Sequence, residues 1–333
     1  MIQKLLRSRR TEDRIQGVNR LIRSDIPERQ GLLLAALSDR SSYVAALAAE
    51  ELGRSADLAG ARAMVERFEF LSEDGPTRDP GCHVRAHLAF GCGRLEYQGA
   101  VDALRVGIRT VQIEPVAGVP FDTGAHLRAN CALALAQLHA PDALRDISLV
   151  LFETDPKLLA HEPSTGGYDY RTSGARKAAA QALRRLGDPN VVVPLTLKLK
   201  IGDRDSPDVL QECIQTLAEL EDPRLVEIAG PYLSASDPHL AAYAGLMLAR
   251  TRDPQVVPLL LGAAQRLTDE PLEAVLIALG SMRIPESDRA LEALRHDDRR
   301  AVRAAVASLR AEQADQPEAS ADWSPPSEQL PLP

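Results

Sequence analysis

A helical segment that recurs nine times between residues 13 and 309 is the feature that most constrains the fold of this chain. The anchors, which are the first residues of the nine copies, are Asp13, Val44, Val84, Leu127, Ala175, Val209, Leu240, Pro271 and Ala301. The residue eight positions after the anchor is Leu in eight of the nine copies, and the residue four positions after it is mostly small. A helix that alternates bulky and small side chains along one stripe packs closely on its neighbours, so the repeat predicts a stack of helices.

A second helical segment precedes each copy, and several of these segments begin with Asp-Pro, at 188–189, 222–223 and 253–254. Asp caps free amides at the start of a helix and Pro suits its first turn, so each copy is expected to pair with the helix before it. Successive anchors lie 31, 40, 43, 48, 34, 31, 31 and 30 residues apart, which is about the length of one helical hairpin. The chain is therefore predicted to be all-α, with about nine helical hairpins stacked as an α-α superhelix, or solenoid, over residues 1–310.

The Asp-Pro openings and second helices such as DDRRAVRAA at residues 297–305 resemble those of HEAT repeats. The short spacing is similar to that of the subgroup shared with phycobilisome-lyase-type proteins. The resemblance extends over about residues 11–310 and implies a HEAT-like solenoid. Because the family includes scaffolds, lyases, a metal hydroxylase and DNA glycosylases, the resemblance leaves the activity open.

Composition and charge narrow the cellular setting of the chain. Its 333 residues have a formal net charge of −8, which disfavours a chain-wide nucleic-acid surface. No apolar stretch is long enough for a signal peptide or for a membrane span. The four cysteines are widely separated and form no C-x-x-C pair, which is typical of reduced thiols. We expect a cytoplasmic protein.

Residues 311–333 differ in composition from the repeats. They contain five acidic residues, no basic ones, five prolines and the only tryptophan of the chain, Trp323. Such a segment cannot bury enough apolar surface to fold by itself, so it is predicted to be a disordered, acidic, Pro-rich tail. A capture motif around Trp323 is the alternative.

The three longest spacings are consecutive, so three insertions are expected to emerge beside one another, at about residues 71–81, 110–125 and 155–173. The last of them carries the sequence GGYDYR, with Tyr168 and Tyr170. Long loops commonly carry function, which makes this cluster the candidate region for binding. Simple drift in loop length is the structural alternative.

Arg85, Arg128 and Arg176 occupy one identical position in these three repeats, directly after the anchor. A row of guanidinium groups can bind carboxylates or phosphates of a partner bidentately. The alternative is structural, because HEAT-type arrays use Asp/Arg ladders between repeats and buried Arg is normally paired. Asp79, Asp122 and Asp169 precede the three arginines by six or seven residues and are the expected partners in that case.

Histidines show a parallel pattern. His83 and His126 directly precede their anchors, while His87 and Asn130 lie three residues after them. His83 and His87 are one helical turn apart, and with His126 they could in principle reach a metal ion. No H-E-x-x-H motif supports such a site, so exposed or hydrogen-bonded histidines are expected and no metal is predicted.

These features favour a non-catalytic protein-binding scaffold. The expected partner is a protein or an acidic peptide, with a small anionic ligand as a further option, bound by the second helices and the inserted loops. The alternative, implied by the resemblance to phycobilin lyases, is an enzyme or carrier that handles a small ligand in a pocket near Cys82 and the candidate histidines. A glycosylase-like function is disfavoured by the negative charge. No catalytic residue and no cofactor is predicted.

Overall fold

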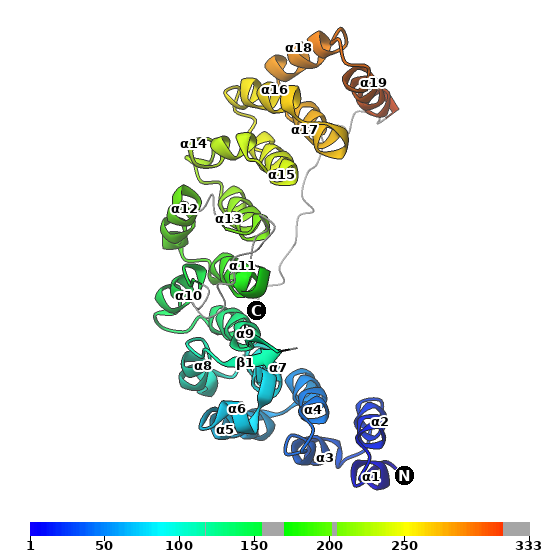
Figure 1. The fold of residues 1–333 in the computed structure, drawn as a ribbon, viewed down its shortest axis with the longest axis vertical. Helices are drawn as coiled ribbons and strands as arrows, with labels where there is room; N and C mark the ends of the chain where they lie inside the picture. Colours follow the sequence, from blue (N-terminus) through cyan, green and yellow to red (C-terminus); the bar gives the residue numbers. More distant parts are fainter. Residues whose placement is uncertain (117, 155–169, 202–204, 316–333) are drawn as a thin grey trace, which may run out of the picture. The chain divides into compact units, whose positions relative to one another are not determined.

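The computed structural model describes residues 1–116, 118–154, 170–201 and 205–315 (Figure 1). These residues form helices joined by short turns, which confirms the predicted all-α class, with one small addition of β-structure. The chain divides into two compact units, Met1–Ile228 and Ala229–Pro333. No helix within the described ranges is long and apolar enough to cross a membrane.

The first unit contains six helical pairs within its described residues. The first helices of the pairs are α1 (Ile2–Leu6), α3 (Arg29–Ala36), α5 (Leu58–Ser72), α8 (Val101–Gly107), α10 (Ala143–Leu151) and α12 (Val192–Ile201). The second helices, which carry the repeated segment, are α2 (Thr11–Ile22), α4 (Ser42–Ser55), α7 (His83–Arg94), α9 (Gly124–Gln137), α11 (Tyr170–Leu186) and α13 (Pro207–Glu219). Helix α14 (Leu225–Ala229) lies at the boundary of the unit.

Short elements occupy the insertions and turns of the first unit. They are α6 (Gly75–Arg78) and the 3-10 turns η1 (Pro80–Cys82), η2 (Gln98–Ala100) and η4 (Pro189–Val191). The insertion at 110–125 contains an antiparallel hairpin of β1 (Ile113–Val116) and β2 (Val119–Asp122), in which Ile113 lies opposite Asp122. This hairpin is the β-structure that the repeat pattern did not predict. Most of the third insertion, at 155–169, lies outside the described residues.

The second unit follows the same pattern with shorter connections. It contains η5 (Gly230–Ser234), α15 (Pro238–Ala249), α16 (Val256–Arg266), α17 (Asp269–Ser281), α18 (Pro285–Leu294) and α19 (Arg300–Asp315). Helix α19 continues past residue 310, where the tail was expected to begin. Residues 316–333, to which the prediction of disorder mainly applies, lie outside the described residues.

The turns form for the reasons expected from the sequence. In the Asp-Pro turns, the carboxylates of Asp188, Asp222 and Asp253 each accept a hydrogen bond from the backbone N–H two residues later, at 2.8 Å. Each bond satisfies an amide that the following helix leaves free. The aspartates therefore cap the turns that lead into α12, α14 and α16, as predicted.

The residues eight positions after each anchor, which we call the leucine stripe, form the core of both units. Eight of its nine members are buried: Leu21, Leu52, Cys92, Leu135, Leu183, Leu217, Leu248 and Leu279. The ninth, Leu309 in α19, is half-buried. Small residues bring the second helices together, since a Cβ atom on Gly53 of α4 would lie 2.4 Å from the Cα atom of Gly91 in α7. These two helices therefore present their exposed side chains close together.

Candidate functional site

The three predicted arginines lie inside the first unit. Arg85, Arg128 and Arg176 are 2%, 4% and 7% exposed. Each guanidinium group is paired with at least one carboxylate. Their geometry is that of the structural alternative, in which buried arginines hold the repeats together.

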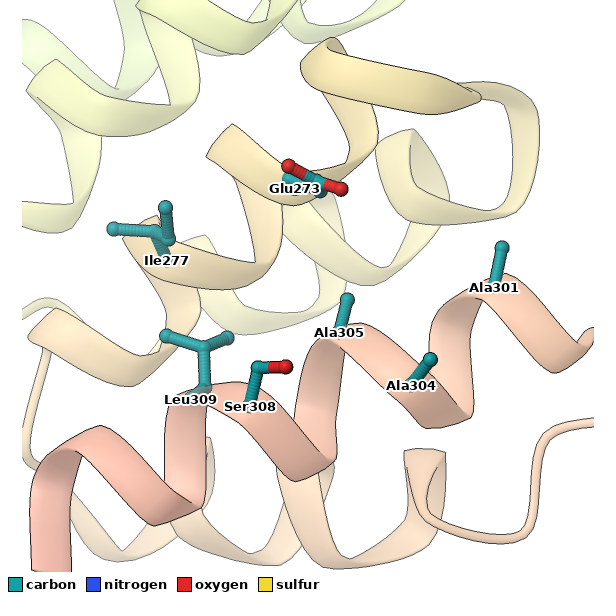
Figure 2. Close-up of a pocket in the computed structure, with 7 residues that line it drawn as sticks. All are labelled: Glu273, Ile277, Ala301, Ala304, Ala305, Ser308 and Leu309. Atoms are coloured by element: carbon teal, nitrogen blue, oxygen red, sulfur yellow. The ribbon is translucent and has the colours of Figure 1, made fainter.

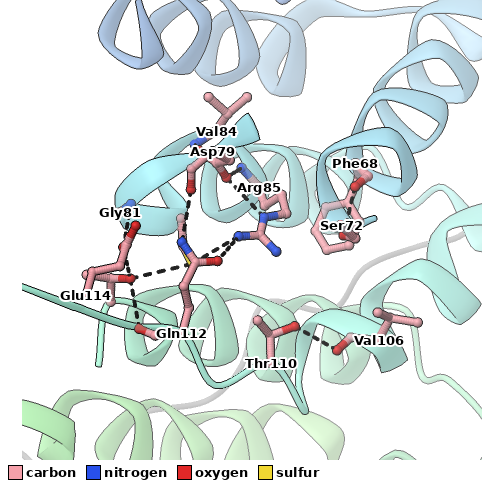
Figure 3. A network of polar contacts seen from close by, with 12 residues as sticks. Phe68, Ser72, Asp79, Gly81, Val84, Arg85, Val106, Thr110, Gln112 and Glu114 are labelled. Carbon is pink, nitrogen blue, oxygen red and sulfur yellow. Dashed lines mark hydrogen bonds and ion pairs between the residues drawn. The ribbon is translucent and has the colours of Figure 1, made fainter. Parts of the chain in front are cut away.

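Arg85 joins the first insertion to the second (Figure 3). Its Nε atom donates to the carboxylate of Asp79 at 3.1 Å, and its Nη2 atom donates to the side-chain oxygen of Gln112 at 2.6 Å. Asp79 also accepts from the backbone N–H groups of Val84 and Arg85, both at 3.0 Å. One buried carboxylate therefore caps α7 and binds the arginine of the same helix.

The β-hairpin is tied to the first insertion by a second set of contacts. Glu114 of β1 accepts hydrogen bonds from the backbone N–H of Gly81, at 2.8 Å, and from the hydroxyl of Thr123. Burial raises the pKa of Glu114, but the hydrogen bonds from Thr123 and Gly81 outweigh burial and hold the pKa below its ordinary value. Glu114 is therefore ionised at neutral pH and connects the two insertions.

Arg128 repeats the arrangement one helical pair further on. Its Nη2 atom lies 2.8 Å from Asp122 Oδ2, an ionic contact, and its Nε atom donates to Glu153 at 2.7 Å. Asp122 also accepts from the backbone N–H of Gly124, at 3.0 Å, at the start of α9. The aspartate partners predicted for Arg85 and Arg128 are thus present in the structure.

Arg176 has a different described partner from the one expected. Its Nε and Nη2 atoms donate to the carboxylate of Asp205, at 3.1 and 2.9 Å. Lys198 also pairs with Asp205. Asp169, the predicted partner, lies outside the described residues.

A fourth arginine belongs to the same row. Arg14 of α2 also directly follows its anchor, is 4% exposed and makes a two-pronged contact with Asp39, at 2.7 and 3.0 Å. Asp39 accepts in turn from the backbone N–H of Ser41 at 2.8 Å. The sequence contained the signal for Arg14, because its position in the repeat is identical to that of the other three.

Exposed or half-buried ring-bearing side chains occur on three consecutive second helices, α4, α7 and α9. His83 of α7 is exposed, and its ring lies 6.2 Å from the ring of Tyr43 in α4, which is 71% exposed. On α9, His126 lies 3.4 Å from Asn130, whose amide nitrogen donates to the carbonyl of Ala86 at 2.9 Å. The structure therefore places three of the predicted site residues on adjoining helices.

His87 and Phe90 extend this surface along α7. The spacing from residue 83 to 87 and 90 keeps the three side chains on one side of the helix. His87 is half-buried and Phe90 is 38% exposed. We define the ring face as the side chains of α4, α7 and α9 that lie together on this surface: Tyr43, His83, His87, Phe90, His126 and Asn130.

His87 and His126 of the ring face favour the uncharged form. Burial lowers the pKa of His87, and His83 lowers it further, while Glu50 opposes the change. Burial also lowers the pKa of His126, with smaller contributions from His87 and His83. At neutral pH these two imidazoles are therefore neutral rings with one donor and one acceptor nitrogen each.

The surfaces of the next second helices have a different character. Lys177 of α11 pairs with Asp208 of α13, at 3.4 Å, and Arg184 pairs with Glu212 and Glu219, at 3.2 and 3.3 Å. Gln181 donates to Glu212 at 3.0 Å. The charged groups of α11 and α13 thus bind one another, whereas the ring face presents the rings of Tyr43, Phe90 and three histidines.

The structure does not bring His83, His87 and His126 together in a metal-binding arrangement. In the described part of the chain, no group of three or more His, Cys, Asp or Glu side chains has a metal-binding arrangement. Burial raises the pKa of Cys82 to about 11 and that of Cys92 to about 12. These thiols are therefore protonated at neutral pH and are poor nucleophiles.

The two candidate tyrosines of the third insertion contribute nothing to the described site. Tyr168 lies outside the described residues, and Tyr170 is the first residue of α11, without a described side chain. Sequence reasoning missed Tyr43 and Phe90. Tyr43 could have been found, because it precedes its anchor in the same way as His83 and His126.

Known proteins resemble this chain in fold. No protein-family model and no curated protein sequence matches it. YibA from Escherichia coli has a similar structure, with a TM-score of 0.54, 16% identity and coverage of 91% of this chain and 99% of YibA. The CpcE–CpcF phycocyanin lyase complex from Nostoc gives a TM-score of 0.43, 16% identity and coverage of 86% and 96%. Human deoxyhypusine hydroxylase gives a TM-score of 0.32 and 17% identity, with coverage of 95% of each chain. Together with the paired helices and the leucine stripe, the similarity to YibA identifies the fold of this chain as a HEAT-like helical repeat.

Proposed function

We propose that this chain is a non-catalytic protein-binding scaffold whose partner contacts the ring face and the adjoining β-hairpin. The observation that supports this proposal most strongly is the gathering of Tyr43, Phe90 and three histidines on α4, α7 and α9. Three of the seven histidines of the chain lie on this surface beside Tyr43 and Phe90, so the concentration of rings is distinctive. Exposed aromatic side chains commonly anchor protein interfaces.

The buried arginines have a positioning role in this proposal. Arg85 and Arg128 hold the first two insertions against α7 and α9, two of the helices that carry the ring face. Because each is enclosed and paired, contact with a partner falls to the side chains of the ring face on the same helices and on α4. The scaffold would thereby present a surface that is already ordered before binding, which reduces the entropy lost on association.

The chemistry of the ring face suits a protein segment that carries carboxylates. The neutral imidazoles of His87 and His126 can each donate one N–H, and a carboxylate close to them would favour the protonated ring. Tyr43 and Phe90 offer apolar surface to the rest of the segment. An acidic peptide is therefore the proposed partner class.

Affinity capture from extracts of the source cells tests this proposal. The bait proteins are the wild type, a ring-face variant (Tyr43→Ala, Phe90→Ala, His126→Ala) and a matched control variant with three exposed apolar residues of first helices replaced (Leu58→Ala, Val106→Ala, Leu149→Ala). Circular dichroism establishes that all three are folded. A protein partner should be retained by the wild type and the control and lost from the ring-face variant.

Two results would contradict the proposal. Equal recovery of the same proteins by both variants would show that the ring face is not the binding surface. A bound pigment or metabolite in the eluate, without a protein partner, would instead favour the function in small-ligand handling.

A further inference from the structure

An open groove lies between the second helices of the last two pairs, along positions of the last repeat that are closed in the repeat before it. A pocket of about 340 Å³ lies between α17 and α19 (Figure 2). Its lining residues are Glu273 and Ile277 of α17 and Ala301, Ala304, Ala305, Ser308 and Leu309 of α19. The side chains of Ile277 and Leu309 point toward the same space, and Ile277 is 49% exposed.

The repeat pattern explains why this groove is unusual. Ala301, Ala305 and Leu309 occupy the anchor position and the positions four and eight residues after it. In α17 the equivalent residues are Pro271, Val275 and Leu279, and all of them are buried. In α19, Ala301 is exposed and the other two are half-buried. The last repeat therefore leaves open a stripe of the kind that is buried in the repeat before it.

We propose that residues 316–333 of the same chain occupy this groove, with the indole ring of Trp323 between Ile277 and α19. Ligand pockets have volumes of about 300 Å³ and above, so the groove is large enough for a bulky ring. Trp323 is the only tryptophan of the chain, and the four small side chains Ala301, Ala304, Ala305 and Ser308 leave room for it.

The length of the chain allows this contact. Trp323 lies eight residues beyond Asp315, where α19 ends, and eight extended residues span at most about 26–29 Å. Ala301 lies fourteen residues before Asp315, which corresponds to about 21 Å along a helix. Trp323 can therefore reach every part of the groove from the end of the helix that forms one wall.

Charge favours the same occupant. Residues 316–333 contain three acidic residues and no Lys or Arg. Residues 300–311 of α19 contain Arg300, Arg303 and Arg310 and no acidic residue. Arg300 and Arg303 are exposed. The acidic segment would thus lie against a basic helix, while Glu273 is the one acidic residue among the lining residues.

The fluorescence of the single tryptophan tests the proposal on the full chain. A docked indole emits at a shorter wavelength than one in water, so the full chain should emit at a shorter wavelength than a synthetic peptide of residues 316–333. Ile277→Asp and Ala304→Glu, on opposite walls of the groove, should each move the emission toward that of the peptide. Leu259→Asp, at an exposed position of α16 that does not line the groove, should leave it unchanged.

The other outcomes overturn the proposal. Emission from the full chain that equals that of the peptide would show that Trp323 is not docked. A short-wavelength emission that both groove variants retain, with their folds verified by circular dichroism, would place the ring elsewhere. A shift that disappears on dilution would show that the groove is occupied by the tail of a second copy instead of the same chain.

Discussion

The two units share one repeat but differ in what their cores contain. In the described residues of the first unit, buried polar or charged side chains include four arginines and three of the aspartates that pair with them, Asp79, Asp122 and Asp205. Across the described residues of the second unit, Ser287 is the one buried polar side chain. The same helical repeat is therefore stabilised by buried charge in one unit and by apolar packing in the other.

The difference follows from the connections that lead into the second helices. Asp39, Asp79, Asp122 and Asp205 each accept a hydrogen bond from a nearby backbone N–H group, and each binds an arginine of a second helix. A buried connection carries backbone amides that need acceptors, and an aspartate supplies one. The arginine then neutralises the buried carboxylate. Buried charge in this molecule thus serves to hold the connections, and two of these connections lead into α7 and α9, which carry most of the ring face.

The largest effect that distinguishes the units is expected from Asp79→Ala. This substitution leaves Arg85 buried without its carboxylate and leaves the N–H groups of Val84 and Arg85 without an acceptor, so we expect a loss of about 3–5 kcal/mol in the free energy of unfolding. Chemical denaturation measures the loss. Asp102→Ala is the control, because the side chain of Asp102 is 95% exposed and its removal should change the stability by less than about 0.5 kcal/mol. Equal stability of the two variants would mean that the buried pair is not structural.

Substitutions in the leucine stripe should affect both units alike. Leu217→Ala in the first unit and Leu279→Ala in the second each remove a side chain that is at most 1% exposed. We expect each to cost about 2–5 kcal/mol, because a cavity remains in the stack. Denaturation together with hydrogen exchange measures and locates the effect. A wild-type stability for either variant would contradict the register assigned to the repeat.

A smaller effect is expected for the buried polar residue of the second unit. The hydroxyl of Ser287 donates to the carbonyl of Ile284 at 2.9 Å and lies 3.3 Å from its N–H group. Ser287→Ala should cost about 1 kcal/mol, which is typical of one local hydrogen bond. A loss as large as that of Asp79→Ala would remove the distinction between the two cores.

The smallest effect is expected from mild acid. Because the pKa values of His87 and His126 are lowered in the folded chain, the unfolded state binds protons first as the pH falls below about 6.5. The first unit should therefore lose stability between about pH 6.5 and the lowered folded pKa values. Hydrogen exchange, corrected for its intrinsic dependence on pH, measures this loss. His87→Gln combined with His126→Gln should abolish it, and an unchanged pH dependence in that variant would contradict the assignment.

The sequence predicted those features that repeat. The leucine stripe and the Asp-Pro turns gave the helical pairs, and the spacing of the aspartates before Arg85 and Arg128 gave their partners. The hairpin at 113–122 was not predicted, because it belongs to one insertion and has no periodic signal. The pairing of Arg176 with Asp205 joins different repeats, which spacing within a single repeat does not reveal.

The candidate site was predicted in part for the same reason. His83, His126 and Asn130 were identified from their shared positions, and they do lie on adjoining helices. Whether an arginine faces solvent or the core depends on how far each helix is rotated and on which carboxylates approach it. That rotation is set by tertiary packing, so the sequence left both alternatives for the arginine row open and the structure decided between them.

Histidine modification in the presence of a captured partner tests the binding face most directly. Acylation by diethyl pyrocarbonate, followed by mass spectrometry, compares the ring-face histidines with His239 and His296, which are exposed in the second unit. The account predicts that the partner slows the modification of His83 and His126 and leaves His239 and His296 unchanged. Protection of His239 or His296, with full reactivity at His83 and His126, would contradict it.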